Sequence, residues 1–183
     1  VLKLFQFTYM LMILGLRPYQ VQFINAIPCL SRFYIGDPNQ SIYGYSGSSN
    51  LFDKLDGFKV EKRTTNYRCA QNINDYAEGF LEEGCRPHAT CLTENGEINF
   101  VEEIPDDGQL SFVELMNSEE AKRTHPERTI TTIHKSKGLT FDSVSIVGID
   151  TRKGGEEDNV AYVAATRARN KLNIIVRSEK YGN

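Results

Sequence analysis

The sequence has no long apolar run, no cysteine framework and no low-complexity tract. Its most apolar stretch, residues 1–16, is interrupted by Lys3, Gln6 and Thr8, whereas a membrane span needs ~20 predominantly apolar residues. The four cysteines form no C-x-x-C pair, which argues against a disulfide-rich secreted domain. With 40% apolar and 25% charged residues, the chain is expected to be a globular cytoplasmic protein with no membrane partner.

No metal site is expected either. Cys85, His88 and Cys91 lie close together in the sequence, but they supply only part of a ligand set and no fourth ligand is near. The first residue is Val1 rather than Met, so the chain is either a processed product or a piece cut from a longer reading frame, and we expect the second.

Charge is distributed unevenly along the chain. Residues 1–120 carry 9 basic and 17 acidic groups, and residues 121–183 carry 12 basic and 7 acidic groups. A polyanionic partner is therefore expected to bind mainly the C-terminal third. The 13 acidic residues from Asp75 to Glu120, set against Arg86 alone, are typical of a solvated face.

Strand-like and helix-like segments alternate, which predicts an α/β fold with a parallel sheet. Residues 1–16 and Ser31–Gly36 are expected to be buried strands, the second leading into a loop from Asp37 to Gly47. A loop is expected to enter an amphipathic helix near residues 69–81, whose apolar positions are Ala70, Ile73, Ala77 and Phe80. Further strands are expected at Thr129–Ile133, Ser143–Val147 and Leu172–Val176. A helix capped by Asp158 is expected to carry Val160, Val163 and Ala164.

Polar segments with chemical potential follow several of these elements. In GDPNQSIYGYSG, the Gln40 amide can sense a phosphate or a positioned water, and Tyr43 and Tyr45 offer flat faces for unpaired bases. The alternative is a tyrosine-rich turn packed on the core. In TTNYRCAQNI, Tyr67 can stack on a purine and Arg68 can bind a phosphate, although an arginine that satisfies carbonyls is equally ordinary.

Two later segments are cationic. TIHKSKGLTFD places His134, Lys135 and Lys137 around Gly138, where a phosphate can approach the backbone closely; a solvated charged face is the alternative. YVAATRARNKL places Arg167 near the end of a short helix, where an arginine can simply interact with the helix dipole.

In their order along the chain, the strings GDPNQSIYG, NYR, TIHKSKGL-F and YVA-TRA resemble the later motifs of UvrD/Rep-type superfamily 1 helicases. The resemblance covers residues 17–176. It implies a RecA-like parallel sheet flanked by helices, of the P-loop NTPase type but without the phosphate loop. It further implies that residues 1–52 end the first RecA-like domain and that residues 53–183 form the second.

The resemblance also implies roles for individual residues. Gln40 would couple the γ-phosphate to movement, Tyr67 would cover the adenine, and Arg68 and Arg167 would act as arginine fingers. Gln40, Arg68 and Arg167 are thus the implied catalytic residues, and together with Tyr67 they form the implied nucleotide site. The implied DNA-contacting residues are Tyr43, Tyr45, Thr132, His134 and Lys137.

The sequence departs from this family in the parts that hold ATP. No glycine is followed by lysine, so the G-x-x-x-x-G-K-[ST] loop is missing. The acidic pair that holds Mg²⁺ would fall near Leu11 and Met12. Ser46 stands where the family usually has arginine, and Thr140 where it usually has glutamate.

The expected function is therefore that of the C-terminal part of an ATP-dependent DNA helicase, which is not catalytic alone. ATP and Mg²⁺ are expected as cofactors of the complete enzyme and are not expected to bind this chain tightly. Single-stranded or duplex DNA and the missing N-terminal RecA-like domain are the expected partners. A degenerate remnant that binds DNA or another protein is the rival interpretation, and an RNA helicase is a further alternative.

Overall fold

The computed structural model describes residues 8–12, 16–44, 57–106, 109–112, 119, 121–123, 126–127, 129–149 and 154–176. The chain divides into an N-terminal unit, residues 1–60, and a C-terminal unit, residues 61–183. The division expected after residue 52 falls outside the described residues. Assignment of the two units to successive RecA-like domains stays a prediction.

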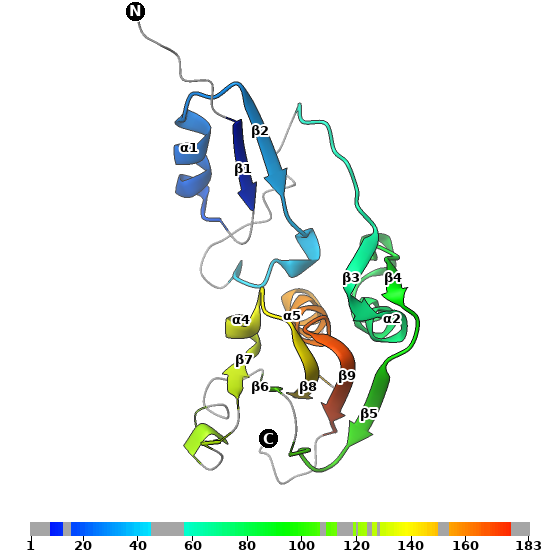
Figure 1. Ribbon diagram of the computed structural model, residues 1–183. Helices are drawn as coiled ribbons and strands as arrows, with labels where there is room; N and C mark the ends of the chain where they lie inside the picture. Colours follow the sequence, from blue (N-terminus) through cyan, green and yellow to red (C-terminus); the bar gives the residue numbers. More distant parts are fainter. Residues whose placement is uncertain are drawn as a thin grey trace, which may run out of the picture. The chain divides into compact units, whose positions relative to one another are not determined.

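The N-terminal unit contains a strand–helix–strand motif formed by β1 (Thr8–Met12), α1 (Pro18–Ala26) and β2 (Ser31–Ile35) (Figure 1). The strands are parallel, with Thr8 opposite Ser31 and Met12 opposite Ile35. The Oε1 of Gln20 accepts from the Arg17 N–H at 2.8 Å, which satisfies a backbone donor at the helix start. The strand expected within residues 1–16 is confirmed at Thr8–Met12, and its side chains lie outside the described residues.

β2 is a strand, as expected, but the expectation that it is buried is wrong. Arg32 Nη2 donates to the carbonyl of Asn25 at 2.8 Å, and Tyr34 Oη donates to Asn25 Oδ1 at 2.7 Å, so this face is tied to the end of α1. The side chains on the other face, Phe33 and Ile35, are 56% and 51% exposed. A parallel sheet normally has both faces covered, and within the described residues α1 covers one.

The C-terminal unit is built around a five-stranded parallel sheet of order β5-β9-β8-β6-β7. Its strands are β5 (Glu97–Val101), β6 (Gln109–Phe112), β7 (Ile130–Thr132), β8 (Phe141–Val147) and β9 (Ala168–Ile175). A separate parallel pair is formed by β3 (Thr65–Ala70) and β4 (Thr90–Thr93). The helices are α2 (Gln71–Glu78), η4 (Glu83–Cys85), α4 (Ile133–Ser136) and α5 (Glu156–Ala165).

The sequence pattern located α2, β7, β8, α5 and β9. It missed β4, β5 and β6, which lie in the stretch expected to be a solvated face, and it did not predict α4. Two further expectations differ from the structure. The segment expected to be a loop ahead of α2 is β3, which pairs with β4 across an irregularity between Asn66 and Ala70. Asp158 lies inside α5 rather than at its start, because Gly155 is the residue that caps the helix. The Asp158 carboxylate still accepts from the Gly154 N–H at 3.0 Å. The α/β class with parallel strands is confirmed.

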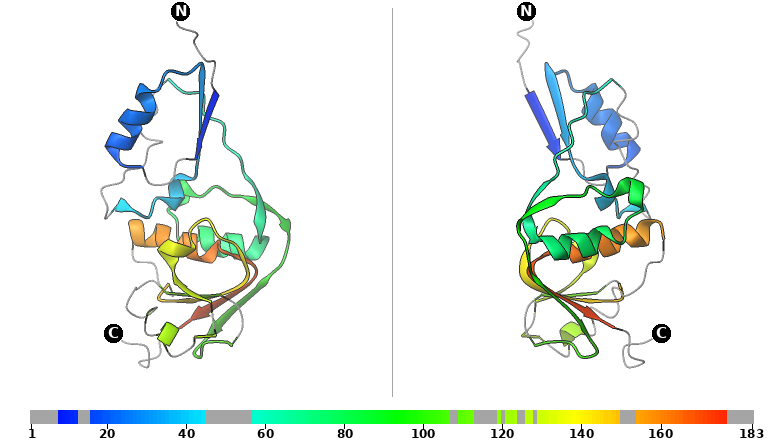
Figure 2. Two further views of the ribbon diagram at one scale, coloured as in Figure 1. Left: turned by 60° about the vertical axis from the view of Figure 1, so that its left-hand side comes forward. Right: turned by 90° about the vertical axis from the view of Figure 1, so that its right-hand side faces the viewer.

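Both faces of the central sheet are apolar. On one face, Val144, Ile146, Leu172 and Ile174 are fully buried, and α2 and α5 lie along this side of the strands (Figure 2). On the other face, Ile130, Val147 and Ile175 form a second buried cluster. The expected apolar positions of α2, namely Ala70, Ile73, Ala77 and Phe80, are all buried. Among the described residues, no helix is long and apolar enough to cross a membrane.

Candidate functional site

Gln40 lies in the N-terminal unit, directly after β2. The short helix η1 (Pro38–Gln40) begins at Asp37, whose Oδ1 accepts from the Asn39 N–H at 2.9 Å. The Gln40 Nε2 donates to Asp37 Oδ2 at 3.0 Å. Asp37 thus forms an Asx turn that also holds the glutamine amide. The group predicted to sense a phosphate is fixed where a parallel strand ends, which is where α/β proteins place ligands.

The tyrosines of the same segment are only partly described. Tyr43 is half-buried and follows Ile42, which is fully buried. Tyr45 and Ser46 lie outside the described residues. The proposed base-stacking role of Tyr43 and Tyr45 therefore stays a prediction.

Tyr67 and Arg68 lie on β3 in the C-terminal unit, where strand alternation points them to opposite sides. Tyr67 is 77% exposed, so its ring is accessible for stacking on a base. Arg68 is half-buried, and its Nη1 donates to the Thr166 carbonyl at 3.4 Å. The aromatic group and the cation are thus presented on different sides of one strand.

Arg167 follows α5 and is 1% exposed. Its Nε donates to the Val163 carbonyl at 2.9 Å, its Nη1 to the Leu139 carbonyl at 3.0 Å, and its Nη2 to Thr166 Oγ1 at 3.1 Å. Carbonyls at a helix C-terminus carry partial negative charge that attracts a cation. In this conformation the guanidinium is used to join the end of α5 to the segment ahead of β8, so a finger role for Arg167 requires these bonds to rearrange.

Thr166 connects the two arginine-bearing segments. Its carbonyl accepts from Arg68 and, at 3.5 Å, from the Cys69 Sγ, while its hydroxyl accepts from Arg167. The hydroxyl also donates to the Tyr162 carbonyl at 2.9 Å. Arg68 and Arg167 are far apart in the sequence, and the motif resemblance implies that both act as arginine fingers. They therefore meet through Thr166 at the end of α5.

A buried polar chain holds the Arg68 backbone. Glu78, 5% exposed, accepts from Asn74 Nδ2 at 2.7 Å, and Asn74 Oδ1 accepts from Asn66 Nδ2 at 2.8 Å. Asn66 Oδ1 then accepts from the backbone N–H groups of Arg68 and Cys69 at 2.8 and 3.2 Å. Because Glu78 accepts from the Asn74 amide nitrogen, the Asn74 oxygen is left to accept from Asn66, so Glu78 fixes the orientation of both amides in turn.

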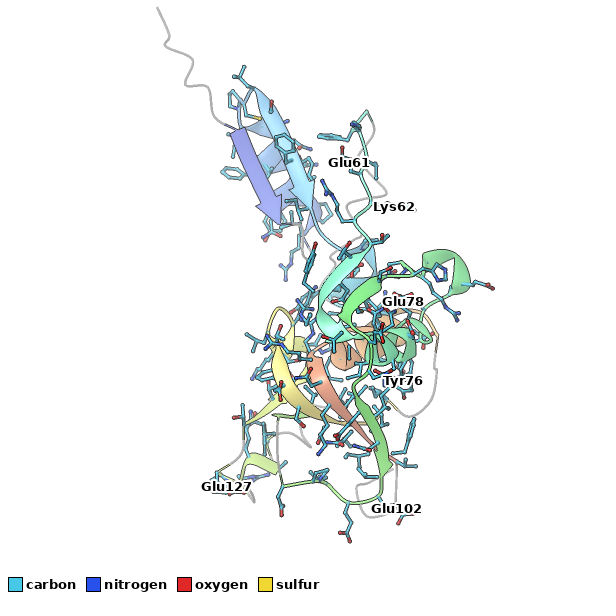
Figure 3. All side chains as sticks on the ribbon, turned by 45° about the vertical axis from the view of Figure 1, so that its right-hand side comes forward. Glu61, Lys62, Tyr76, Glu78, Glu102 and Glu127 are labelled. Carbon is cyan, nitrogen blue, oxygen red and sulfur yellow. The ribbon has the colours of Figure 1, made fainter. Side chains whose placement is uncertain are left out.

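The same carboxylate anchors the segment that leads to β4. The N–H groups of His88 and Ala89 donate to Glu78 at 2.9 and 3.0 Å, and Figure 3 shows Glu78 on α2 facing this segment. Sequence reasoning missed Asn74 and Glu78. Their spacing was a usable signal, since both fall beside Ile73 and Ala77 on the face of α2 that is predicted to be buried.

The predicted nucleic-acid segment joins β7 to α4. Thr132 is 6% exposed, and its Oγ1 accepts from the Lys135 N–H at 3.3 Å as the cap of α4. His134 and Lys137 are half-buried, and Gly138 has a φ of 89°. A left-handed turn of this kind favours glycine. The hydroxyl hydrogen of Thr132 remains able to donate, so a phosphate contact there is chemically possible.

Two cysteines lie near this constellation. Burial raises the pKa of Cys69 above its usual value of 9.0, an effect that the neighbouring Arg68 charge opposes. Burial also raises the pKa of Cys91, to about 11. Both side chains are therefore neutral thiols at pH 7 and poor nucleophiles.

The position expected for the acidic pair lies at the end of β1. Leu11 and Met12 are opposite Tyr34 and Ile35 there, and neither residue type has a side-chain oxygen that could bind Mg²⁺. Within the described part of the chain, no group of His, Cys, Asp or Glu side chains is placed to hold a metal.

The fold is shared with solved viral helicases. The helicase of PRRSV superposes with a TM-score of 0.64 at 21% identity, covering 93% of this chain and 35% of that one. The arterivirus nonstructural protein 10 helicase in complex with DNA gives a TM-score of 0.56 at 20% identity, covering 84% and 35% of the respective chains. At these identities the likeness shows the fold alone.

The chain is also similar in sequence to a known protein. The Gabija protein GajB of Bacillus cereus (strain VD045) is 33% identical over 93 residues, which are 48% of this chain and 18% of that protein. The chain thus spans well under two thirds of the length of the proteins that it resembles. The family model of the viral superfamily 1 RNA helicase core domain matches residues 15–176. With almost its whole length matched, the chain belongs to the superfamily 1 helicase core domain family.

Proposed function

We propose that this chain is the C-terminal part of a UvrD/Rep-type motor that couples ATP hydrolysis to movement along DNA and to its unwinding. The observation that carries the proposal is the meeting of Arg68 and Arg167 at Thr166. Once the bonds that hold Arg167 rearrange, two cations at this place can neutralise the charge that grows on a transferred phosphoryl group. Gln40 would report the state of that phosphate, and the exposed Tyr67 would cover the base.

The chain alone is not expected to hydrolyse ATP. It contains no G-x-x-x-x-G-K-[ST] loop, and Leu11 and Met12 occupy the expected place of the acidic pair. The missing N-terminal part of the motor would supply the phosphate loop. The four free cysteines suit a reducing compartment such as the cytoplasm.

The same absences favour a second candidate from another class. A remnant that has lost turnover could keep its nucleic-acid surface, or a surface for another protein, without any use for ATP. The retained Arg68, Arg167 and Gln40 favour the motor, because a remnant has no need of phosphate-sensing groups.

The test is the affinity of the purified chain for a fluorescent single strand across a salt series. Lys137→Ala should weaken binding and reduce the slope of log K against log salt by about 0.7, the value for one lost phosphate contact on a single strand. Lys135→Ala removes the same charge two positions away and is the matched control. Equal effects of the two substitutions would mean general attraction rather than a track through Lys137.

Probes of DNA and RNA with the same base sequence separate the polymers, since the family model is named for RNA helicases. Preference for RNA would overturn the DNA assignment. Absence of binding at low salt would favour the remnant that binds another protein. Nucleic-acid-stimulated ATP hydrolysis by this chain alone would contradict the proposal that it is not catalytic.

A further inference from the structure

β5 is at one edge of the central sheet and pairs with β9 on its inner side. The Val101 carbonyl accepts from the Val176 N–H at 2.9 Å, so the backbone groups of Val101 are directed to β9. Successive residues of a strand direct these groups to opposite sides. The N–H and C=O groups of Ile98 and Phe100 are therefore directed to the outer edge, where the described part of the chain offers no partner strand.

An aromatic side chain stands beside this edge. Phe100 is 60% exposed, and its ring meets Tyr76 edge-on with centroids 5.9 Å apart. Tyr76 in turn meets Phe80, which is 5% exposed, at 5.3 Å. The three rings thus form a row from Phe80 in the core to Phe100 on the surface, and Phe100 lies next to the unpaired backbone groups. An added strand would cover both the ring and the edge.

The ends of β5 are acidic. Glu94 and Glu97 are exposed at its start, and Glu102 and Glu103 at its end; Figure 3 shows Glu102 pointing away from the ribbon. Glu97 lies opposite Lys171 of β9, whereas Glu94, Glu102 and Glu103 form no ion pair with any described residue. Uncompensated acidic charge therefore brackets the free edge.

This charge decides which strand could be added. Pairing with β5 of a second copy would bring like charges together across the strands, which is destabilising. Acidic residues at an edge protect a sheet from such pairing. A strand that carries lysine or arginine at both ends would instead gain attraction at both ends and backbone hydrogen bonds between them.

We propose that β5 is a docking edge for an extended basic segment of another protein, which adds to the sheet as a strand beside Ile98 and Phe100. Peptide addition to a sheet edge draws affinity from main-chain hydrogen bonds and specificity from side chains. Here the specificity elements are the Phe100 ring and the flanking carboxylates. The interaction uses none of the residues proposed for nucleotide or nucleic-acid binding.

The test uses the fluorescein-labelled peptide Lys-Lys-Val-Thr-Val-Thr-Lys-Lys and fluorescence anisotropy with the full chain. Phe100→Val and Phe100→Pro both remove the ring, but only proline removes the outward N–H. Proline is tolerated on an edge strand at such a position. Phe100→Pro should therefore bind about threefold to tenfold more weakly than Phe100→Val, the effect of one lost hydrogen bond.

The role of charge is tested with the double variant Glu102→Gln, Glu103→Gln. It should bind the basic peptide more weakly, and the binding should depend less on salt concentration. Equal binding by Phe100→Val and Phe100→Pro would show non-specific attraction and overturn the proposal. So would a wild-type dimer that Phe100→Pro converts to a monomer in sedimentation, because a second copy would then cover the edge.

A direct measurement on the wild-type chain keeps the proposal testable if Phe100→Pro does not fold. Peptide addition should slow hydrogen exchange of the Ile98 and Phe100 amides, which are directed outward. Exchange of the Asn99 amide, which is directed to β9, should change little. Unchanged exchange at Ile98 and Phe100 in the presence of bound peptide would exclude strand addition.

Discussion

Arg68 and Arg167 are joined through a single residue, Thr166, whose carbonyl accepts from the first guanidinium at 3.4 Å and whose hydroxyl accepts from the second at 3.1 Å. Thr166 ends α5, so the positions of both arginines depend on how that helix terminates. Arg167 is the more constrained of the two, because its guanidinium is also bonded to carbonyls on either side of it. Replacement of Arg167 should therefore lower the stability of the C-terminal unit, whatever its effect on catalysis.

Arg167→Ala is expected to destabilise the C-terminal unit by about 3 kcal/mol or more. The substitution removes charged donors from the buried carbonyl of Val163 and the part-buried carbonyl of Leu139, and a buried acceptor left without a partner costs about 1–3 kcal/mol. Urea unfolding followed by circular dichroism measures this change. Arg169→Ala is the matched control, because Arg169 is exposed and surface substitutions usually change stability by less than about 0.5 kcal/mol.

A wild-type unfolding midpoint for Arg167→Ala would mean that the buried bonds contribute nothing and that the side chain is free to serve a nucleotide. If Arg167→Ala is destabilised, as expected, a loss of helicase activity in that variant would not by itself identify Arg167 as a catalytic group. The stability of the variant would have to be measured first.

Glu78→Gln is expected to loosen the Arg68 backbone. Glutamine replaces an acceptor oxygen by an N–H₂ donor, which would face either the Asn74 amide or a backbone N–H of His88 or Ala89. We expect a loss of about 1–3 kcal/mol and faster hydrogen exchange at His88 and Ala89. If the amide chain transmits the change, exchange at Arg68 will also accelerate.

Glu82→Gln provides the control, since Glu82 is exposed just beyond α2. Faster exchange at His88 with unchanged exchange at Arg68 would show that Glu78 anchors its own segment only. The orientation of Asn66 would then be set locally by its Asx turn.

Much of this fold could be predicted from local pattern. The β-prone run SRFYI predicts the strand β2, and the spacing of Ile73 and Ala77 predicts the buried face of α2. Burial of β2 could not be predicted, because the exposure of Phe33 and Ile35 depends on which elements cover the sheet. β3 was missed for a related reason, since its partner β4 lies beyond α2 and the pairing is interrupted near Asn66.

The sequence predicted the residues of the candidate site better than it predicted their contacts. Motif order identified Arg68 and Arg167, but it could not show that Thr166 joins them, because that contact depends on where α5 ends relative to β3. The contact between Gln40 and Asp37 is local, and an Asx turn could have been expected from the Asp-Pro-Asn-Gln sequence. Residue type indicated the chemistry, and tertiary packing determined whether each group is available for it.

Gly96→Ala is expected to destabilise the protein through overpacking. A Cβ at this position would lie 2.7 Å from the Asn170 carbonyl oxygen and 2.9 Å from side-chain carbons of Ala70 and Ile73. Gly96 is also held on both sides by Asn72, which accepts from its N–H and donates to its carbonyl, each at 2.7 Å. The backbone therefore has little room to move away.

We expect a cost of about 1–3 kcal/mol, measured as a shift of the urea midpoint. Gly84→Ala is the matched control, because a Cβ there would meet nothing within 4 Å. Removal of glycine at such a compatible position stabilises by about 0.4–1 kcal/mol through the unfolded chain. If Gly96→Ala leaves the urea midpoint unchanged, the connection between β4 and β5 can shift despite the two hydrogen bonds that Asn72 forms with Gly96.

Stability should fall in alkaline solution partly because of Cys91. Burial raises the pKa of this thiol from 9.0 to about 11, so the folded state holds the proton more tightly than the unfolded state does. The stability contributed by the neutral thiol is complete below pH 9 and is lost progressively as pH rises from 9 towards 11. Tyrosine and lysine side chains titrate in the same range, so the wild-type curve alone does not isolate the cysteine.

The contribution of Cys91 is the difference between the pH dependence of stability of the wild type and that of Cys91→Ala. The variant is expected to be less stable below pH 9, because it loses a buried side chain, and its stability should decline less steeply between pH 9 and 11. Urea midpoints at half-unit intervals measure both curves. Cys85→Ala, which removes a thiol from an exposed position, is the matched control. Parallel curves for wild type and Cys91→Ala would mean that the Cys91 thiol ionises equally in the folded and unfolded states, and that its burial between β3 and α2 does not exclude water.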